Sequence, residues 1–130
     1  TWSDISSKRN AFRLSSQGFL YDGRGPGAFL RQDSPATQLL LLGVLNTPLV
    51  REFLLLLNPT LSVNIGEIHK IPICGLDNAL LGPIPNLVER CVLLSQSDWD
   101  AYEHSWDFQS LPILTASSES APSLVSSYTT

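Results

Sequence analysis

The sequence predicts a mixed α/β (α+β) fold, in which a short β-hairpin and further short strands pack on apolar helices and a helical segment follows. Three observations lead to this class. Short apolar runs separated by glycine-rich turns begin the chain, which is typical of paired strands. Leucine-rich stretches of helical length occupy residues 38–57. Residues 97–108 place aromatic side chains at helical spacing.

The first thirty residues favour strands and turns. Residues 11–14 and 19–21 are the two predicted strands, with a turn at residues 15–18. Residues 22–27 are expected to form a loop, because three glycines permit positive φ and Pro26 lacks a backbone donor. A hairpin followed by a loop is the resulting prediction.

Two apolar helices come next. Ser34-Pro35 can begin a helix, and residues 38–45 continue it with helical patterning. Asn46-Thr47-Pro48 interrupts that helix, and a second one is predicted from Pro48 to about Leu57. It should stop at Asn58-Pro59, since the residue before a proline is biased away from the α region. Because both helices are apolar almost all round, we expect them to be largely buried.

The remaining elements are shorter. Residues 62–73 partly alternate with period two and predict one or two strands, with Gly66 at a bend or bulge. Residues 86–95 predict a helix with one apolar side. Residues 115–130 are rich in Ser and Thr and are expected to be a linker or the start of a truncated helix.

A second amphipathic helix is predicted from Ser97 and should end at Leu111-Pro112. Ser97 would be its N-cap, with Asp100 three positions on as in a capping box. Trp99, Tyr102 and Trp106 are three and seven residues apart and would share one face. This pattern indicates a docking surface, and the competing explanation, which we favour, is burial of the same aromatics within the chain.

No residue set predicts catalysis or a metal site. The acids of residues 98–107 lie at helical spacing, which favours a solvated face over a catalytic pair. The spacing of the His and Cys residues matches no recurring zinc pattern, and we expect the two cysteines to be buried thiols. The positions concerned are His69, Cys74, Cys91 and His104.

Asn58-Pro59-Thr60-Leu61 invites comparison with the Asn-Pro-Pro-aromatic motif of amino-group DNA methyltransferases. That motif needs an aromatic side chain to stack on a flipped base, and Leu61 cannot provide it. A helix stop is the better interpretation of this tetrapeptide.

Charge is divided unevenly along the chain. Residues 1–51 hold six Lys and Arg against three Asp, whereas residues 91–130 hold five acids and no Lys or Arg. The basic half can meet a polyanion such as DNA, or it is an ordinary solvated surface. Lys8, Arg9 and Arg13 are the predicted phosphate-binding residues, beside several serine hydroxyls. No apolar run reaches the length of a membrane span, so no membrane partner is expected.

Three groups of segments together resemble the region that follows the catalytic domain in large adenine-specific DNA methyltransferases of BREX phage-defence systems. The first two groups also resemble type II restriction-methylation fusion proteins. The groups are residues 1–7 with 18–22, residues 42–47 with 57–68 and 71–73, and residues 97–103 with 105–108.

This resemblance implies a role for residues 1–114 as part of a DNA target-recognition-like region. In that family the catalytic half binds S-adenosylmethionine and methylates adenine, and a downstream domain selects the DNA sequence. The chain would then be a non-catalytic fragment of a cytoplasmic enzyme, with double-stranded DNA and the rest of the parent methyltransferase as partners. The fragment itself would hold no cofactor. The alternative is a protein-interaction module that uses the acidic aromatic helix, with Trp99, Tyr102 and Trp106 binding a partner.

Overall fold

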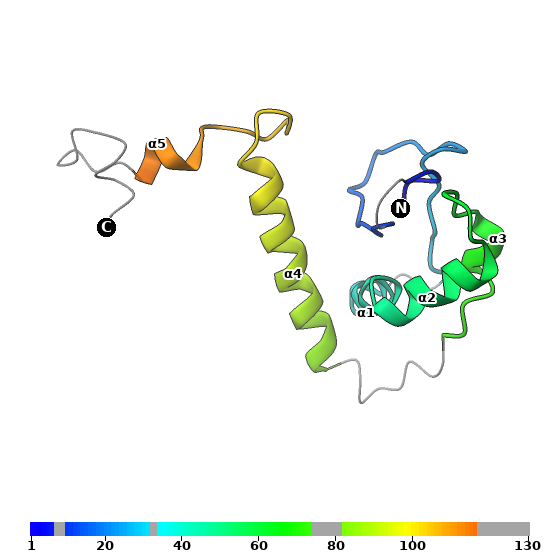
Figure 1. Cartoon of the computed structure of the whole chain (residues 1–130). Helices are drawn as coiled ribbons and strands as arrows, with labels where there is room; N and C mark the ends of the chain where they lie inside the picture. Colours follow the sequence, from blue (N-terminus) through cyan, green and yellow to red (C-terminus); the bar gives the residue numbers. More distant parts are fainter. Residues whose placement is uncertain (7–9, 32–33, 74–81, 117–130) are drawn as a thin grey trace. The chain divides into compact units, whose positions relative to one another are not determined.

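The structure is a computed structural model that describes residues 1–6, 10–31, 34–73 and 82–116. It divides into two compact units, unit 1 from Thr1 to Glu89 and unit 2 from Arg90 to Thr130, and each is described by itself. The regular elements in the described ranges are α1 (Pro35–Leu45), α2 (Pro48–Leu57), α3 (Ile65–Ile68), α4 (Pro83–Asp100) and α5 (Pro112–Ala116) (Figure 1). Most of the predicted linker, residues 117–130, lies outside the described residues.

The predicted mixed α/β fold class is wrong, because the described residues contain helices and no β-strand. Residues 11–14 and 19–21 are loop, so there is no hairpin. The predicted strand region at residues 62–73 contains α3, and Gly66 lies inside that helix. A β-bridge between Ile5 and Ser62 is what remains of sheet-like pairing in this part of the chain.

The two predicted hairpin strands do not pair, because the N-terminal segment binds the backbone on which the hairpin would depend. The Thr1 nitrogen donates to the Arg13 carbonyl and the Arg13 nitrogen donates to the Thr1 carbonyl, both at 2.9 Å. The Asp4 nitrogen donates to the Arg24 carbonyl at 3.0 Å. Strand propensity is context-dependent, and these tertiary contacts outweigh the local preference of two short apolar runs.

The other side of the N-terminal segment pairs with the residues that precede α3. Val63 donates its backbone N–H to the Asp4 carbonyl at 2.8 Å, and Ser6 donates to the Leu61 carbonyl at 3.0 Å. The indole Nε1 of Trp2 donates to the Val63 carbonyl at 2.9 Å. The N-terminal segment therefore joins parts of unit 1 that lie about sixty residues away in the sequence.

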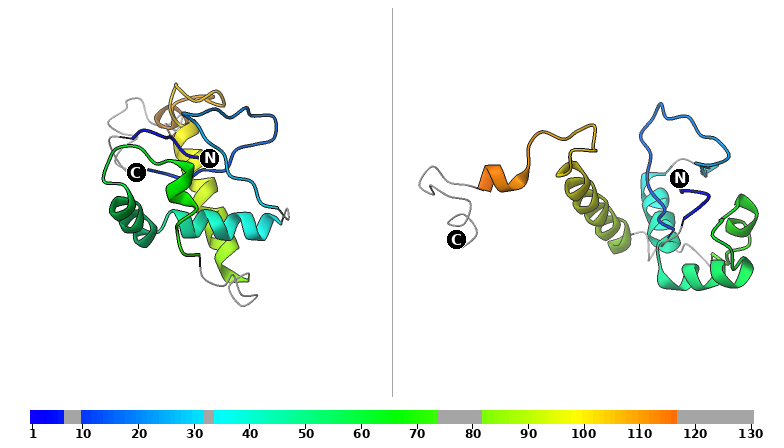
Figure 2. Two further views of the ribbon diagram at one scale, coloured as in Figure 1. Left: turned by 90° about the vertical axis from the view of Figure 1, so that its right-hand side faces the viewer. Right: turned by 45° about the horizontal axis from the view of Figure 1, so that its top comes forward.

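The pair of apolar helices and the break between them are confirmed. Ser34 and Thr47 are the N-caps of α1 and α2, and a proline follows each of them. α2 ends before Asn58, as the following proline predicts. The described residues contain no single helix that is long and apolar enough to cross a membrane. Together α1 and α2 have that length and composition, but they are bent by 64° at Asn46-Thr47 (Figure 2).

The core of unit 1 lies where α1 and α2 meet the N-terminal segment. The expected burial of both helices is wrong for α2, because Val50 and Leu54 are buried while Leu49 and Leu56 are exposed, Leu56 at 81%. α2 packs against α1 and α3 and leaves its opposite side uncovered. The buried apolar side chains are Trp2, Phe12, Leu40, Leu42, Leu45, Val50, Leu54, Val63 and Ile71.

In the C-terminal part of the described chain, one helix covers the helix predicted at residues 86–95 and only the first residues of the predicted aromatic helix. α4 continues through Ser97, which is therefore not an N-cap, and it ends at Asp100. Neither proline nor glycine separates residues 95 and 100, so nothing in the backbone forces a break. Residues 101–107 form turns in place of the predicted aromatic helix, and α5 begins at Pro112, where the sequence predicted a stop.

Candidate functional site

Residues 14–23 form an exposed loop between two arginines (Figure 2). Arg13, at one end, pairs through its backbone with Thr1. Arg24, at the other end, pairs with Asp4 through its backbone carbonyl and through a 3.1 Å ion pair between Nη1 and Oδ2. The Arg24 side chain is still 75% exposed. The N-terminal segment thus holds both ends of the loop and leaves both arginines at the surface.

Side chains within the loop give it a defined shape. Gly18 has a φ of +97°, in the region that L side chains rarely adopt. The Tyr21 ring lies against Gly27, where an added Cβ would be 2.9 Å from Tyr21 Cδ1. The same ring meets Phe29 edge-on, with centroids 5.2 Å apart. The residues between Gly18 and Tyr21 are left at the tip, although their apolar pattern predicts a strand.

Asp22 fixes the turn at the end of this loop. Its Oδ1 accepts hydrogen bonds from the backbone N–H groups of Gly25 at 2.8 Å and of Arg24 at 2.9 Å. These two bonds, with the positive charge of Arg24, lower the pKa of the Asp22 carboxyl below its ordinary value of 3.8. Asp22 thereby orders a turn while remaining ionised.

We expect an NMR titration to give Asp22 a pKa below 3.8. Because the folded-state pKa is the lower one, the stabilisation is complete above the ordinary value and disappears as the pH falls through the lowered pKa. Asp22→Asn is the control, since its amide oxygen can still accept both hydrogen bonds but does not titrate. A carboxyl that titrated at or above the value of an unstructured peptide would contradict the assigned turn.

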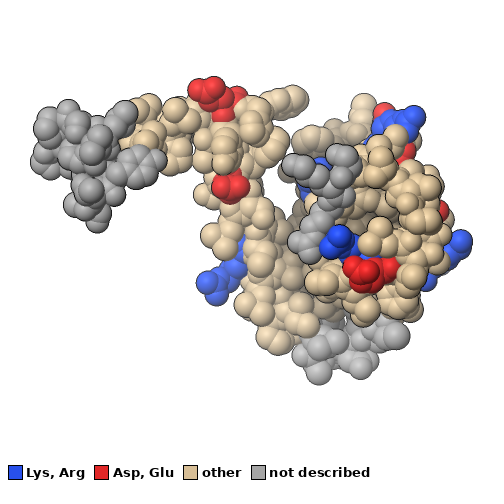
Figure 3. All heavy atoms as spheres, in the orientation of Figure 1, with Lys and Arg blue, Asp and Glu red and all other residues tan. Residues whose placement is uncertain are grey.

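The predicted phosphate-binding residues are described only in part. Arg13 is exposed at the end of the loop, whereas Lys8 and Arg9 lie outside the described residues. The described part of unit 1 contains one ion pair, between Arg24 and Asp4. On the visible face the Lys and Arg side chains of this unit are separate spots, and the acids of unit 2 lie along the end of α4 and the following turns (Figure 3). In the described part of unit 1, the cations without an ion pair are Arg13, Arg31, Arg51 and Lys70.

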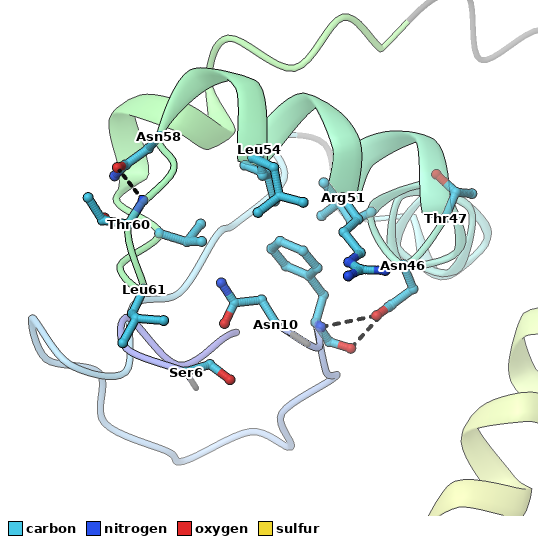
Figure 4. Close-up of a pocket in the computed structure, with 13 residues that line it drawn as sticks. Ser6, Asn10, Asn46, Thr47, Arg51, Leu54, Asn58, Thr60 and Leu61 are labelled. Atoms are coloured by element: carbon cyan, nitrogen blue, oxygen red, sulfur yellow. Dashed lines mark hydrogen bonds between the residues drawn. The ribbon is translucent and has the colours of Figure 1, made fainter. Parts of the chain in front are cut away.

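A cavity of about 140 Å³ lies between the start of the chain and α2 (Figure 4). Asn46 lines it, and its amide makes three hydrogen bonds: Oδ1 accepts from the Phe12 nitrogen, and Nδ2 donates to the carbonyls of Phe12 and Leu42. Asn10 Oδ1 is buried without a partner, and the Arg51 guanidinium faces the cavity. Among the described residues that line this cavity, none carries a carboxylate, imidazole or thiol, the usual groups of a general acid or base.

Asn58 also lines this cavity, and its contacts settle the interpretation of residues 58–61. Its Oδ1 accepts from the Thr60 nitrogen at 3.2 Å and its Nδ2 donates to the Ser62 carbonyl at 3.1 Å. Both ends of the amide are therefore committed to the chain that leaves α2. The prediction of a helix stop is confirmed, because this amide holds the chain that leaves α2.

Two of the three predicted docking aromatics come together in unit 2. The His104 ring lies between those of Trp99 and Tyr102, with centroid distances of 4.1 Å and 5.5 Å. Trp106 is 97% exposed and makes no ring contact in the described residues. The three aromatics therefore do not form the predicted helical stripe. His104 was missed as a member of the cluster because it lies off that face on a regular helix.

A serine holds the turn that brings these rings together. Ser105 is buried, and its hydroxyl donates to Asp100 Oδ1 at 2.6 Å. The same hydroxyl oxygen accepts from the Asp107 nitrogen at 3.2 Å. Asp100 therefore stabilises the turn after α4, and the capping box predicted for Ser97 and Asp100 is wrong because α4 runs through both residues.

We expect acrylamide to quench two of the three tryptophans. Trp99 is 55% exposed and Trp106 is 97% exposed, whereas Trp2 is buried. The double variant Trp99→Phe/Trp106→Phe should retain a blue-shifted emission that resists quenching, because Trp2 alone remains. Strong quenching of that variant, or weak quenching of the wild type, would contradict this exposure pattern.

The described residues contain no group of three or more His, Cys, Asp or Glu side chains placed to hold a metal ion. Cys91 is a free, exposed thiol, so the prediction that it is buried is wrong. It lies on α4, whose outer side is solvated, and Cys74 lies outside the described residues.

No family model matches the chain, and no solved structure gives a significant match. The chain is 34% identical over 115 residues to the adenine-specific methyltransferase PglX of Lacticaseibacillus casei (strain Zhang), a match that covers 88% of this chain. It is 25% identical over 108 residues to the adenine-specific methyltransferase BrxX of Escherichia coli O9:H4 (strain HS), which covers 83% of this chain. The matched parts span 9% and 8% of the lengths of these two relatives. The predicted resemblance is thereby confirmed: over most of its length the chain is similar to a short segment of the adenine-specific methyltransferases PglX and BrxX.

Proposed function

We propose that the chain is a non-catalytic, DNA-contacting segment of a site-specific adenine-N6 DNA methyltransferase in a phage-defence system. The observation that carries the proposal is the match to PglX, which covers 88% of this chain and 9% of the relative. A segment of that size leaves S-adenosylmethionine binding and methyl transfer to the rest of a larger enzyme. Its own task is then to help that enzyme hold or select double-stranded DNA.

The chemistry of unit 1 supports a non-catalytic role. The cavity beside α2 offers the Arg51 guanidinium but no group that can take up or release a proton near neutral pH. The Asn58 amide is bonded to the backbone on both sides, and Leu61 has no aromatic face. These residues build the local fold instead of binding a flipped adenine.

The charges of unit 1 support contact with DNA phosphates. One of its acids is neutralised within the fold, since Asp4 pairs with Arg24, and the Glu67 carboxylate accepts from the Asn64 nitrogen in the capping box of α3. Several cations remain without an ion pair in the described ranges, and Arg13 is among them. Arginine, lysine and serine side chains are the usual phosphate-contacting groups in DNA complexes. Lys8, Arg9 and Arg13 stay the proposed contact residues.

We expect the triple variant Lys8→Ala/Arg9→Ala/Arg13→Ala to flatten the salt dependence of duplex DNA binding. Each lost phosphate contact should reduce the slope of log K against log salt by about 0.9, so the three together should reduce it by roughly 2.7. Binding isotherms of the chain at several salt concentrations measure this slope. Lys70→Ala/Arg90→Ala is the control and should leave the slope unchanged. An unaltered slope in the triple variant would show that the wrong face is assigned.

The second proposal is a protein-docking surface in unit 2. Trp99 and Trp106 are 55% and 97% exposed, and exposed aromatics of this size are enriched where proteins bind one another. The partner would be the rest of the parent methyltransferase. If it is, acrylamide quenching of Trp106 should fall when the chain is part of that larger protein. Equal quenching of Trp106 in the isolated chain and in the larger protein would contradict docking of this surface on the parent methyltransferase.

A further inference from the structure

We propose that Phe19 and Leu20, at the tip of the exposed loop, form an apolar wedge that inserts between stacked base pairs of duplex DNA. This proposal rests on the DNA-contacting function proposed above. It concerns side chains other than Lys8, Arg9 and Arg13, and a different interaction, since a wedge contacts stacked bases and not phosphates.

The two tip residues expose an unusual amount of apolar surface. Phe19 is 61% exposed and Leu20, its neighbour in the chain, is 97% exposed. No ring contact involves Phe19 in the described part of the chain, although Tyr21 and Phe29 nearby do pair with each other. Two adjacent large apolar side chains that project from one loop have the size and shape of the wedges that partly unstack a base step.

The base of the loop is ordered although its tip is exposed. Tyr21 packs on Gly27 and Phe29, and Asp22 binds two backbone N–H groups. The positive φ of Gly18 turns the chain immediately before Phe19. A segment that is already held in shape loses less conformational entropy on binding, which favours insertion of the tip.

The charges around the tip favour DNA over a protein as the partner. Arg13 and Arg24 stand at the two ends of the loop, and the Arg24 side chain is 75% exposed although one of its nitrogens pairs with Asp4. The hydroxyl residues Ser15 and Ser16 are exposed between them. Asp22 is the acid of this loop, and one of its carboxylate oxygens already accepts two backbone hydrogen bonds. Cations on either side of an apolar tip match a base step with its two flanking phosphate backbones.

The test uses the whole chain and duplexes that carry 2-aminopurine at a flexible TA or CA step. The emission of 2-aminopurine rises when the base loses its stacking neighbour, and energy transfer between dyes at the duplex ends reports bending. With the wild type we expect the emission to rise and the duplex to bend. With Phe19→Ala/Leu20→Ala we expect both signals to vanish and the affinity to fall about tenfold, a typical loss for removal of one stacked aromatic.

The salt slope and a matched variant distinguish insertion of the wedge from electrostatic binding to the phosphates. Phe19→Ala/Leu20→Ala should keep the wild-type salt slope, because it removes no phosphate contact. Leu56→Ala removes another exposed leucine, from α2, and should bind and unstack DNA as the wild type does. Phe19→Trp should retain the emission change that Phe19→Ala/Leu20→Ala loses, since indole also stacks on bases.

Three results would overturn the wedge. If the double variant binds and unstacks DNA like the wild type, the tip contacts a protein or nothing. If the wild type binds DNA with a steep salt slope but leaves 2-aminopurine stacked, the wedge is wrong while the DNA-contacting function stands. If the wild type shows no salt-dependent DNA binding, the proposed function fails and the wedge fails with it.

Discussion

Trp2→Ala is expected to lower the free energy of unfolding of unit 1 by about 3–5 kcal/mol, the usual cost of removing a buried aromatic ring. Trp2 is 3% exposed, and the centroids of its ring and the Phe12 ring are 5.7 Å apart. Its indole nitrogen bonds to the Val63 carbonyl, so the side chain joins the start of the chain to the residues before α3. Urea denaturation followed by circular dichroism measures the change.

Trp2→Phe separates the two contributions of that side chain. It keeps most of the ring volume but removes the indole N–H, which leaves the Val63 carbonyl without its partner at a cost of about 1–3 kcal/mol. We therefore expect Trp2→Phe to destabilise the protein less than Trp2→Ala does. Equal stability of Trp2→Ala and the wild type would show that the N-terminal segment does not pack as described.

Leu40→Ala is expected to lower the free energy of unfolding by about 2–5 kcal/mol. Leu40, on α1, is the most completely buried large side chain in the described residues, at 1% exposure. The loss combines the transfer free energy of the removed carbons with the cavity that they leave. Chemical denaturation again measures it, because a change this large moves the midpoint well beyond experimental error.

Leu56→Ala is the matched control for Leu40→Ala. Leu56 is 81% exposed on α2, so its truncation should change stability by no more than about 0.5 kcal/mol. A large loss with Leu56→Ala, or a small one with Leu40→Ala, would contradict the assigned faces of these two helices.

The helices that the sequence predicted correctly begin and end with local signals. α1 and α2 start at a capping residue followed by proline, and α2 stops before Asn58-Pro59. The strands were wrong because their pairing depends on residues far away in the chain. The Arg13 backbone binds Thr1, and Asp4 binds Arg24 and Val63, which no short window of sequence reveals. The prediction that α2 is buried all round was also wrong because it depends on distant residues: composition cannot show which side of a helix packs against a neighbour.

The candidate site could be predicted only as far as residue type allows. The exposure of Arg13 agrees with its assignment to the surface, but its place beside Arg24 at the two ends of one loop needed the structure. Trp99 and Tyr102 were grouped by helical spacing, whereas His104 joins them because the Ser105–Asp100 hydrogen bond turns the chain. The sequence predicts a strand at Phe19 and Leu20. Because that strand finds no partner in the described residues, the two side chains lie in an exposed loop.

The most direct test of the proposed function is the salt dependence of duplex DNA binding by the wild-type chain. Three proposed phosphate contacts predict that log K falls linearly with log salt, with a slope of about −2.7 or steeper. An uncharged analogue of the duplex, of equal length, should show no such salt dependence of binding, since counterion release requires phosphates. Binding that is absent, or whose strength does not change with salt, would contradict the proposal that this chain contacts DNA.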